Sequence, residues 1–287
     1  MSASRLIKRR IKSAKNISQI TKAMEMVSAS KMKRAQDQAI MSRPYAEKLS
    51  STLKSIANFT DPALHPLLQQ NESDKVMLIL ISSDRGLAGS LNTTLFKFAE
   101  EFSRDKEVEL IVIGKKSREY AQKFGRTIIA EFSALPDRIH IEQALPIAEL
   151  ITKAFIEKTY GAVFILHMQF LSTLAQKPLL QQLLPLSYET FEETTQHLTV
   201  KPEYAFEPNA KEVLDFLLPY YLETAIFQTL LDAKASEHSA RMVAMKNASD
   251  NAKEIVAELQ LIYNKSRQAS ITKELLDMTT ATLSVAS

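Results

Sequence analysis

The sequence predicts an α+β fold, in which the N- and C-terminal helices form a long antiparallel coiled coil around an inserted small α/β (Rossmann-like) domain. Three observations predict this fold: both chain ends lack helix breakers, each end carries an apolar stripe with helical spacing, and strands alternate with helices between them. We expect an N-terminal helix over residues 1–58, a globular domain over 75–200 and a C-terminal helix over 209–287.

The helix breakers are confined to the middle of the chain. All five glycines lie between Gly86 and Gly161, and Pro44 is the only one of the ten prolines outside residues 62–219. Residues 1–43 and 220–287 therefore contain neither type. As helices they would span roughly 65 Å and roughly 100 Å, at about 1.5 Å per residue. No compact domain of this size has a core that wide, so we expect their apolar stripes to be buried on each other or on another molecule.

Each predicted terminal helix has apolar residues at spacings of three and four, which is typical of a coiled-coil seam. The first stripe comprises Ile7, Ile11, Ala14, Ile17, Ile20, Met24 and Val27, continued by Tyr45, Leu49, Leu53 and Ile56. The last segment carries Leu222, Ile226, Leu230 and Ala233, then Ala252, Ile255, Leu259 and Ile262. Small residues are dense between 233 and 252, so two helix backbones can approach each other closely there.

The middle of the chain alternates between strand and helix patterns. We predict strands at 76–83, 109–113, 127–132 and 162–170, and helices at about 91–102, 115–124 and 146–159. Pro146 suits the first turn of the last of these helices. This order predicts a small, mostly parallel sheet covered by helices.

The composition excludes several kinds of chemistry. The chain has no cysteine, which excludes disulfides, zinc–thiolate sites and thiol nucleophiles and fits a reducing compartment. The aliphatic run Val76–Ile81 is far shorter than the twenty or so residues that span a membrane. The five histidines are scattered without metal-ligand spacing. We therefore expect no catalytic residue, no metal site and no cofactor.

One loop has the position, but not the sequence, of a phosphate-binding loop. Residues 83–90 (SDRGLAGS) follow a predicted strand and precede a predicted helix. Neither G-x-x-x-x-G-K-[ST] nor G-x-G-x-x-G is present. A tight strand-to-helix connection, with Asp84 stabilising the turn, is the favoured interpretation, and a nucleotide site with Asp84 and Arg85 as a catalytic pair is the alternative.

The basic residues are concentrated at the N-terminal end. Residues 1–57 hold thirteen Lys/Arg against three Asp/Glu, whereas residues 209–287 hold eight against ten. Three interpretations stay open: a solvated face of the coiled coil, a nucleic-acid contact, and attraction to an acidic protein surface. The basic residues are interleaved with the apolar stripe, which is unlike the separate basic block of a zipper protein.

Several segments form a recognisable set of motifs: residues 20–27 (ITKAMEMV), 42–45 (SRPY), 83–87 (SDRGL), 240–248 (ARMVAMKNA) and 267–272 (RQASIT). Together they resemble the ATP synthase gamma-subunit family, the central stalk of F-type ATP synthases, in its bacterial type. The resemblance covers essentially the whole chain. Ala88 and Ser90 depart from it, as does the hydroxyl-rich tail from Thr279 onward.

The resemblance implies a non-catalytic subunit of the proton-translocating complex, present in a single copy and not as a homo-oligomer. Its terminal helices would form a shaft inside a hexamer of α and β subunits, with the globular part against ε and the membrane-embedded c-ring. This CF(1) rotor would transmit torque from the c-ring to the catalytic β subunits, coupling hydrogen ion transport to ATP synthesis. It would be peripheral, at the cytoplasmic face of the bacterial inner membrane. The alternative is a basic helical-hairpin module that binds nucleic acid.

The resemblance also implies contact residues at matching positions. Lys22 and Met24, together with Arg241, Gln268 and Thr272, would link the shaft helices to each other and to β. Tyr204 and Glu207 would form a foot on the polar loops of the c-ring.

Overall fold

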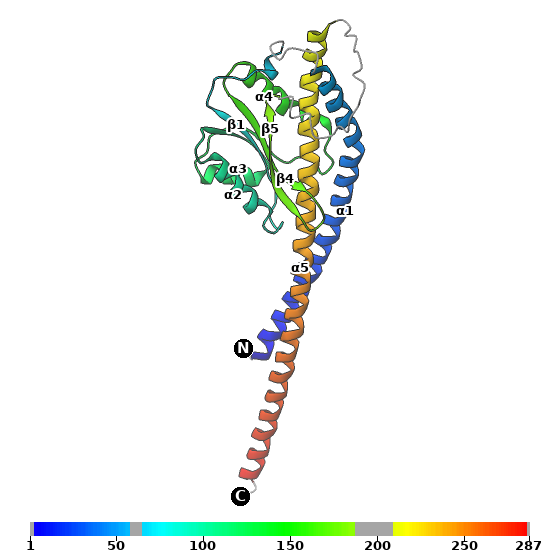
Figure 1. The fold of residues 1–287 in the computed structure, drawn as a ribbon. Helices are drawn as coiled ribbons and strands as arrows, with labels where there is room; N and C mark the ends of the chain where they lie inside the picture. Colours follow the sequence, from blue (N-terminus) through cyan, green and yellow to red (C-terminus); the bar gives the residue numbers. More distant parts are fainter. Residues whose placement is uncertain (1–2, 58–64, 187–208, 286–287) are drawn as a thin grey trace. The chain divides into compact units, whose positions relative to one another are not determined.

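The computed structural model describes residues 3–57, 65–186 and 209–285 (Figure 1). These residues form two units: unit 1 comprises Met1–Val27 with Met242–Ser287, and unit 2 comprises Ser28–Arg241. Two helices contribute to both units, α1 (Ala3–Ala57) and α5 (Ala210–Val285). The predicted combination of long terminal helices and an inserted α/β sheet is confirmed.

Unit 2 is built around a five-stranded sheet in the order β3-β2-β1-β4-β5. The strands are β1 (Val76–Ile81), β2 (Val108–Ile113), β3 (Ile128–Phe132), β4 (Ala162–Phe170) and β5 (Gln176–Leu184). The first four are parallel to one another and β5 is antiparallel to β4. The order of β3, β2, β1 and β4 is that of a doubly wound fold, which confirms the Rossmann-like prediction.

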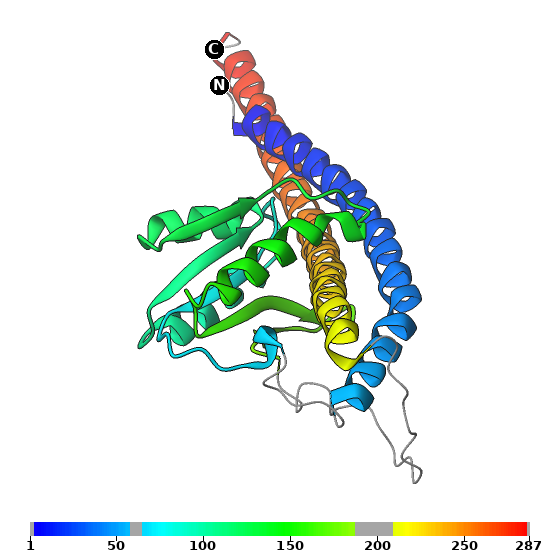
Figure 2. The same cartoon turned by 90° about the horizontal axis from the view of Figure 1, so that it is seen from above.

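Helices cover both faces of the sheet, as Figure 2 shows. The connecting helices are α2 (Leu91–Ser103), α3 (Lys115–Lys123) and α4 (Leu145–Ile156), with short 3-10 turns at Pro66–Leu68 and Ile141–Gln143. Alternate residues of β1 serve the two faces: Leu78 and Leu80 pack with α2 and α3, whereas Met77 and Ile79 pack with α4. All six residues of β1 are buried, which explains why this strand is a continuous apolar run.

The parts of α1 and α5 that belong to unit 2 pack on the α4 face of the sheet. Leu53 and Ile56 of α1 share a core with Leu218, Leu222 and Ile226 of α5 and with the sheet. In unit 2 the two helices run antiparallel, because Ser42 contacts Gln228 whereas Tyr45 contacts Tyr220. The sequence analysis placed these helix segments in separate parts of the chain, 1–58 and 209–287, apart from the globular domain 75–200. These domain boundaries stay a prediction.

The fifth strand was not predicted. Its sequence contains Pro178 and three glutamines, so it lacks the pattern of a buried strand. At the edge of the sheet one side of a strand has no neighbour, and a proline there removes no required hydrogen bond. The position of β5 at the edge therefore explains both its composition and its absence from the sequence prediction.

Unit 1 is a pair of helices with a narrow contact. The hydroxyl of Ser18 donates to the carbonyl of Ser249 over 3.3 Å, and the hydroxyl of Ser249 donates to the carbonyl of Ser18 over 3.3 Å. Side chains this short reach the opposite backbone only when the helices are close. The small residues thus allow the close approach that the sequence predicts.

Only part of the predicted N-terminal stripe is covered in unit 1. Ile11 and Ala14 are buried, whereas Ile17, Ile20 and Val27 are exposed. The partner helix contributes buried Met245, Ser249 and Ala252. Helical spacing predicted the face correctly, but one partner helix covers a narrower strip than the stripe occupies.

Candidate functional site

The candidate site lies at the carboxyl edge of the sheet, where the loop after β1 meets α5. We call residues 82–90 the β1 turn. Within it, the Ser83 amide donates to Asn92 Oδ1 over 3.3 Å, and Asn92 Nδ2 donates to Ser83 Oγ over 2.7 Å. Ser83 Oγ in turn donates to the carbonyl of Arg85 over 2.8 Å. The first turn of α2 therefore holds the β1 turn in place.

The β1 turn is also joined to the loop after β2. Asp84 Oδ1 accepts from the amide of Lys115 over 3.0 Å, and Ser82 Oγ accepts from the amide of Ser117 over 2.6 Å. Both amides belong to the first turn of α3, where backbone donors have no partner within the helix. The predicted turn-stabilising role of Asp84 is confirmed, and its partner comes from the neighbouring strand–helix connection.

Arg241 of α5 holds the β1 turn from the other side. Its Nη2 donates to the carbonyl of Arg85 over 3.1 Å and its Nε to the carbonyl of Gly86 over 3.4 Å. The same Nη2 lies 2.9 Å from Glu237 Oε1, and the side chains of Arg241 and Glu237 are each 10% exposed. A planar guanidinium can bind several acceptors in fixed directions, which suits this arrangement.

A second loop is held by the same region of α5. Ser239 Oγ donates to the carbonyl of Thr173 over 2.7 Å, in the turn between β4 and β5. About two turns earlier in the helix, Asp232 Oδ2 accepts from the amide of Phe170 over 3.2 Å and lies 3.1 Å from His167 Nε2. Residues 232–241 of α5 therefore contact the carboxyl ends of both β1 and β4.

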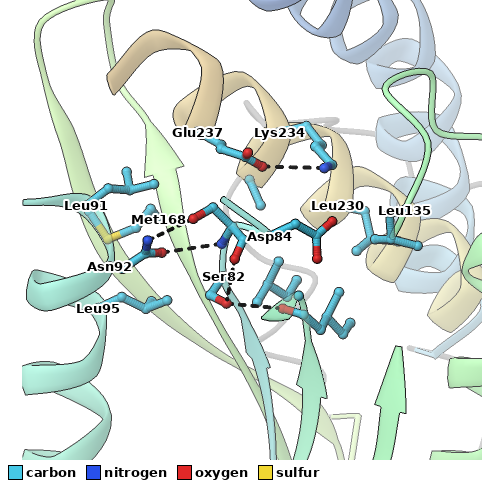
Figure 3. Close-up of a pocket in the computed structure, with 15 residues that line it drawn as sticks. Ser82, Asp84, Leu91, Asn92, Leu95, Leu135, Met168, Leu230, Lys234 and Glu237 are labelled. Carbon is cyan, nitrogen blue, oxygen red and sulfur yellow. Dashed lines mark hydrogen bonds and ion pairs between the residues drawn. The ribbon is translucent and has the colours of Figure 1, made fainter. Parts of the chain in front are cut away.

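A small cavity lies beneath the β1 turn (Figure 3). Ser82 and Asp84 lie on one side, Leu91, Asn92 and Leu95 of α2 on another, and Lys234 and Glu237 of α5 across from them. About 20 Å³ is open to water, which is room for about one water molecule. This geometry favours the interpretation of residues 83–90 as a connection, and the alternative of a nucleotide site gains no support from it.

Four of the predicted contact residues belong to unit 1. Lys22 is exposed and pairs with Glu25 over 3.0 Å, and Met24 is half-buried. Gln268 and Thr272 are exposed on one face of α5, where Thr272 Oγ1 donates to the carbonyl of Gln268 over 3.0 Å. Their roles toward a partner stay predictions.

Arg241, in contrast to those four residues, belongs to unit 2. Tyr204 and Glu207, the predicted foot, lie outside the described residues. The sequence analysis assigned no role to Glu237, Ser239 or Asp232. Glu237 had a recognisable signal, since it stands four residues before Arg241 on the same helix. Ser239 and Asp232 had none, because their partners lie more than sixty residues away in the chain.

Next to this region, burial lowers the pKa of His238 to about 4. The nearby charges are Glu237, Lys234, Arg241 and Asp137, and Nε2 lies 3.9 Å from Asp137 Oδ1, beyond hydrogen-bond distance. An unfolded histidine titrates near 6.5, so the unfolded chain binds more protons between pH 6.5 and 4. Stability is therefore lost as the pH falls through this window.

We expect the free energy of unfolding to fall by about 2 kcal/mol between pH 7 and pH 4.5 because of His238 alone. Urea unfolding of the wild type and of His238→Gln at both pH values measures the difference, with the exposed His140→Gln as a matched control. An equal pH dependence in the wild type and in His238→Gln would show that folding does not change the pKa of His238.

The described residues contain neither a cluster that could bind a metal ion nor a helix that could span a membrane. No three His, Asp or Glu side chains among them gather where they could bind a metal ion. No helix within 3–57, 65–186 and 209–285 has the length and apolarity to cross a bilayer. The contacts that the fold does provide join the β1 turn and the β4–β5 turn to α5.

Such a chain belongs to the class of proteins in which paired terminal helices carry an inserted Rossmann-like domain. Residues 3–285 match a family described as ATP synthase. The ATP synthase gamma chain of Opitutus terrae is 42% identical over 297 residues, covering 100% of both chains. That of Herpetosiphon aurantiacus is 42% identical over 294 residues and covers 97% of both chains. The chain belongs to the ATP synthase gamma-chain family.

Solved structures with a similar fold are rotors of ATP synthases. The rotor of the Euglena gracilis mitochondrial ATP synthase matches with a TM-score of 0.69 at 20% identity, covering 93% of this chain and 98% of that one. A central stalk and c-ring structure from Tetrahymena thermophila matches with a TM-score of 0.63 at 25% identity, covering 80% of this chain and 99% of that one. The fold is thus that of a central-stalk subunit.

Proposed function

We propose that this chain is the rotor shaft of an F-type ATP synthase, which transmits torque from a c-ring to catalytic β subunits. It carries out no bond chemistry itself. Its partners are the α and β subunits, ε and the c-ring, in a complex at the cytoplasmic face of a bacterial inner membrane. Full-length identity of about 40% to bacterial gamma chains supports this assignment.

One observation of the structure carries the proposal. Toward the C-terminal end of α5, within unit 1, large apolar side chains are between 46% and 72% exposed; they are Ile255, Leu261, Ile262, Ile271, Leu275, Leu276 and Met278. Exposed apolar surface on this scale marks a contact with another molecule. A helix that turns inside a sleeve of other subunits meets this requirement.

The proposed mechanism needs no reactive group on this chain. A shaft whose faces differ makes different contacts with each β subunit, and these contacts favour different conformations of the β sites. Rotation of the shaft moves each β subunit through these conformations in turn. ATP is then made on β, and the energy is supplied by ion flow through the c-ring.

Recovery of partner subunits tests the proposal. An affinity tag inserted at the exposed Asp105, between α2 and β2, leaves both terminal helices free. We expect pull-down from the host to recover α and β in a complex that pumps protons when it hydrolyses ATP.

The competing function predicts a different result. A basic nucleic-acid module would bind duplex DNA tightly, and its affinity would fall steeply with salt. Recovery of nucleic acid without α and β subunits would contradict the rotor assignment.

A further inference from the structure

We propose that Arg241 is a positioning residue that fixes the β1 turn to α5. It thereby determines how far along its length α5 is attached to the sheet. The inference rests on the proposed function, because it assigns Arg241 a part in coupling. Arg241 touches no nucleotide and acts through the backbone of Arg85 and Gly86.

The first argument is the number of groups that Arg241 joins. Its guanidinium binds the carbonyls of Arg85 and Gly86, and the carboxylate of Glu237 fixes its orientation from one helical turn away. Glu237 is held in turn by Lys234 Nζ, 3.4 Å from its other oxygen. Because these side chains are almost completely buried, loss of the guanidinium would leave the Glu237 carboxylate without its closest partner.

The second argument is the position of Arg241 along α5. The last leucine of α5 in the apolar core of the sheet is Leu231, and beyond it the helix is held by Asp232, Ser239 and Arg241. From Asp232 to Arg241 the helix rises by about 14 Å. Unit 2 ends at Arg241. Ala233 and Ala240 still pack against the apolar clusters of the sheet, so polar and apolar contacts together hold this part of α5, and Arg241 makes the last of the polar ones.

The third argument is the conformation of the turn that Arg241 holds. Leu87 has a φ of +62° and its side chain is exposed, so no burial of this leucine offsets the strain. Contacts on either side keep the turn in this conformation. Ala88 is buried after Leu87; before it, the Arg85 carbonyl accepts from Ser83 Oγ and from Arg241, and the Gly86 carbonyl accepts from Arg241. Without Arg241 we expect the β1 turn to open more often.

The mechanical consequence follows from these contacts. Torque passes between a domain and a helix only through the residues at which the two are in contact. If Arg241 releases the β1 turn, the last polar contact between the sheet and α5 lies nearer the N-terminal end of the helix. A longer segment of α5 is then unsupported and twists under the same torque. Part of the rotation would then be absorbed by the helix and would not reach the β subunits.

The test uses the assembled complex with Arg241→Gln, Arg241→Lys and Ser239→Ala. Amide hydrogen exchange of Lys115, Lys116 and Ser117, whose amides donate to Asp84, Ser83 and Ser82, reports opening of the β1 turn. ATP-driven proton pumping is compared with the rate of ATP hydrolysis. Lys211→Gln is the matched control, because it removes one positive charge from an exposed position of α5 in the same unit.

We expect Arg241→Gln to speed exchange of the Lys115, Lys116 and Ser117 amides by about tenfold or more, as for a lost buried hydrogen bond to a charged group. The number of protons pumped per ATP hydrolysed should fall, while hydrolysis itself is retained. Arg241→Lys keeps the positive charge but lacks the planar guanidinium with its several donors. We therefore expect exchange and pumping in this variant to lie between those of the wild type and those of Arg241→Gln. Ser239→Ala should speed exchange in residues 171–175 instead, and Lys211→Gln should change neither.

Each other outcome counts against the inference. Unchanged exchange in Arg241→Gln would show that the turn does not depend on Arg241. Faster exchange with full pumping would show that the contact has no part in coupling. If Arg241→Gln does not assemble, the same two readouts are taken on Arg241→Lys. A wild-type chain that recovers no α and β subunits overturns the proposed function, and so the two failures are distinct.

Discussion

Substitution of proline for Ala244 is expected to abolish coupling between proton flow and ATP synthesis while nucleotide binding to the β subunits survives. Ala244 lies within α5, in the part that belongs to unit 1. Proline there removes a backbone donor and its ring clashes with the preceding turn, at a cost of about 3 kcal/mol or more. A kinked or broken shaft cannot transmit torque across the break. Proton-driven ATP synthesis in reconstituted vesicles and nucleotide binding to the purified complex measure the two effects.

The matched control is Ala244→Gly at the same position. Glycine keeps the backbone donor and costs only about 1 kcal/mol in a helix interior. We therefore expect partial coupling in Ala244→Gly and none in Ala244→Pro. Normal proton-driven synthesis in the proline variant would be incompatible with a stiff transmitting helix.

Substitution of alanine for Gly114 is expected to destabilise unit 2 by about 3 kcal/mol or more. Gly114 follows β2 with a φ of +95°, and a Cβ atom there would lie 2.3 Å from the carbonyl oxygen of Ser82. That oxygen belongs to the backbone next to β1, so it cannot move without displacing the β1 turn. Urea unfolding of the isolated chain measures the loss.

Gly86→Ala provides the control for this prediction. Gly86 lies in the exposed β1 turn, and no atom would lie within 4 Å of a Cβ atom added to it. We expect a change of within about 0.5 kcal/mol there, as for other exposed positions. Equal stability of Gly114→Ala and Gly86→Ala would show that the loop after β2 can relax, and that its close approach to Ser82 is dispensable.

Much of the fold could be predicted because its signals are local. The absence of breakers and the spacing of residues such as Ile11 and Ala14 depend only on the neighbouring sequence. The continuous apolar run of β1 likewise predicts a strand that is covered on both faces. The strand β5 could not be predicted, because an edge strand tolerates Pro178 and polar residues. Exposure of Ile17 and Ile20 could not be predicted either, since it depends on how much of a stripe one partner helix covers.

The sequence by itself determined two long terminal helices, a central alternation of strands and helices, and the absence of cysteine chemistry. Only the tertiary structure decided which loops α5 holds. Arg241 and Gly86 are 155 residues apart, and no periodic pattern links a guanidinium to the carbonyls of a distant turn. Helices and strands form through hydrogen bonds and side-chain spacing within a short segment, whereas a contact of this kind exists only after the whole sheet has brought its carboxyl edge against the helix.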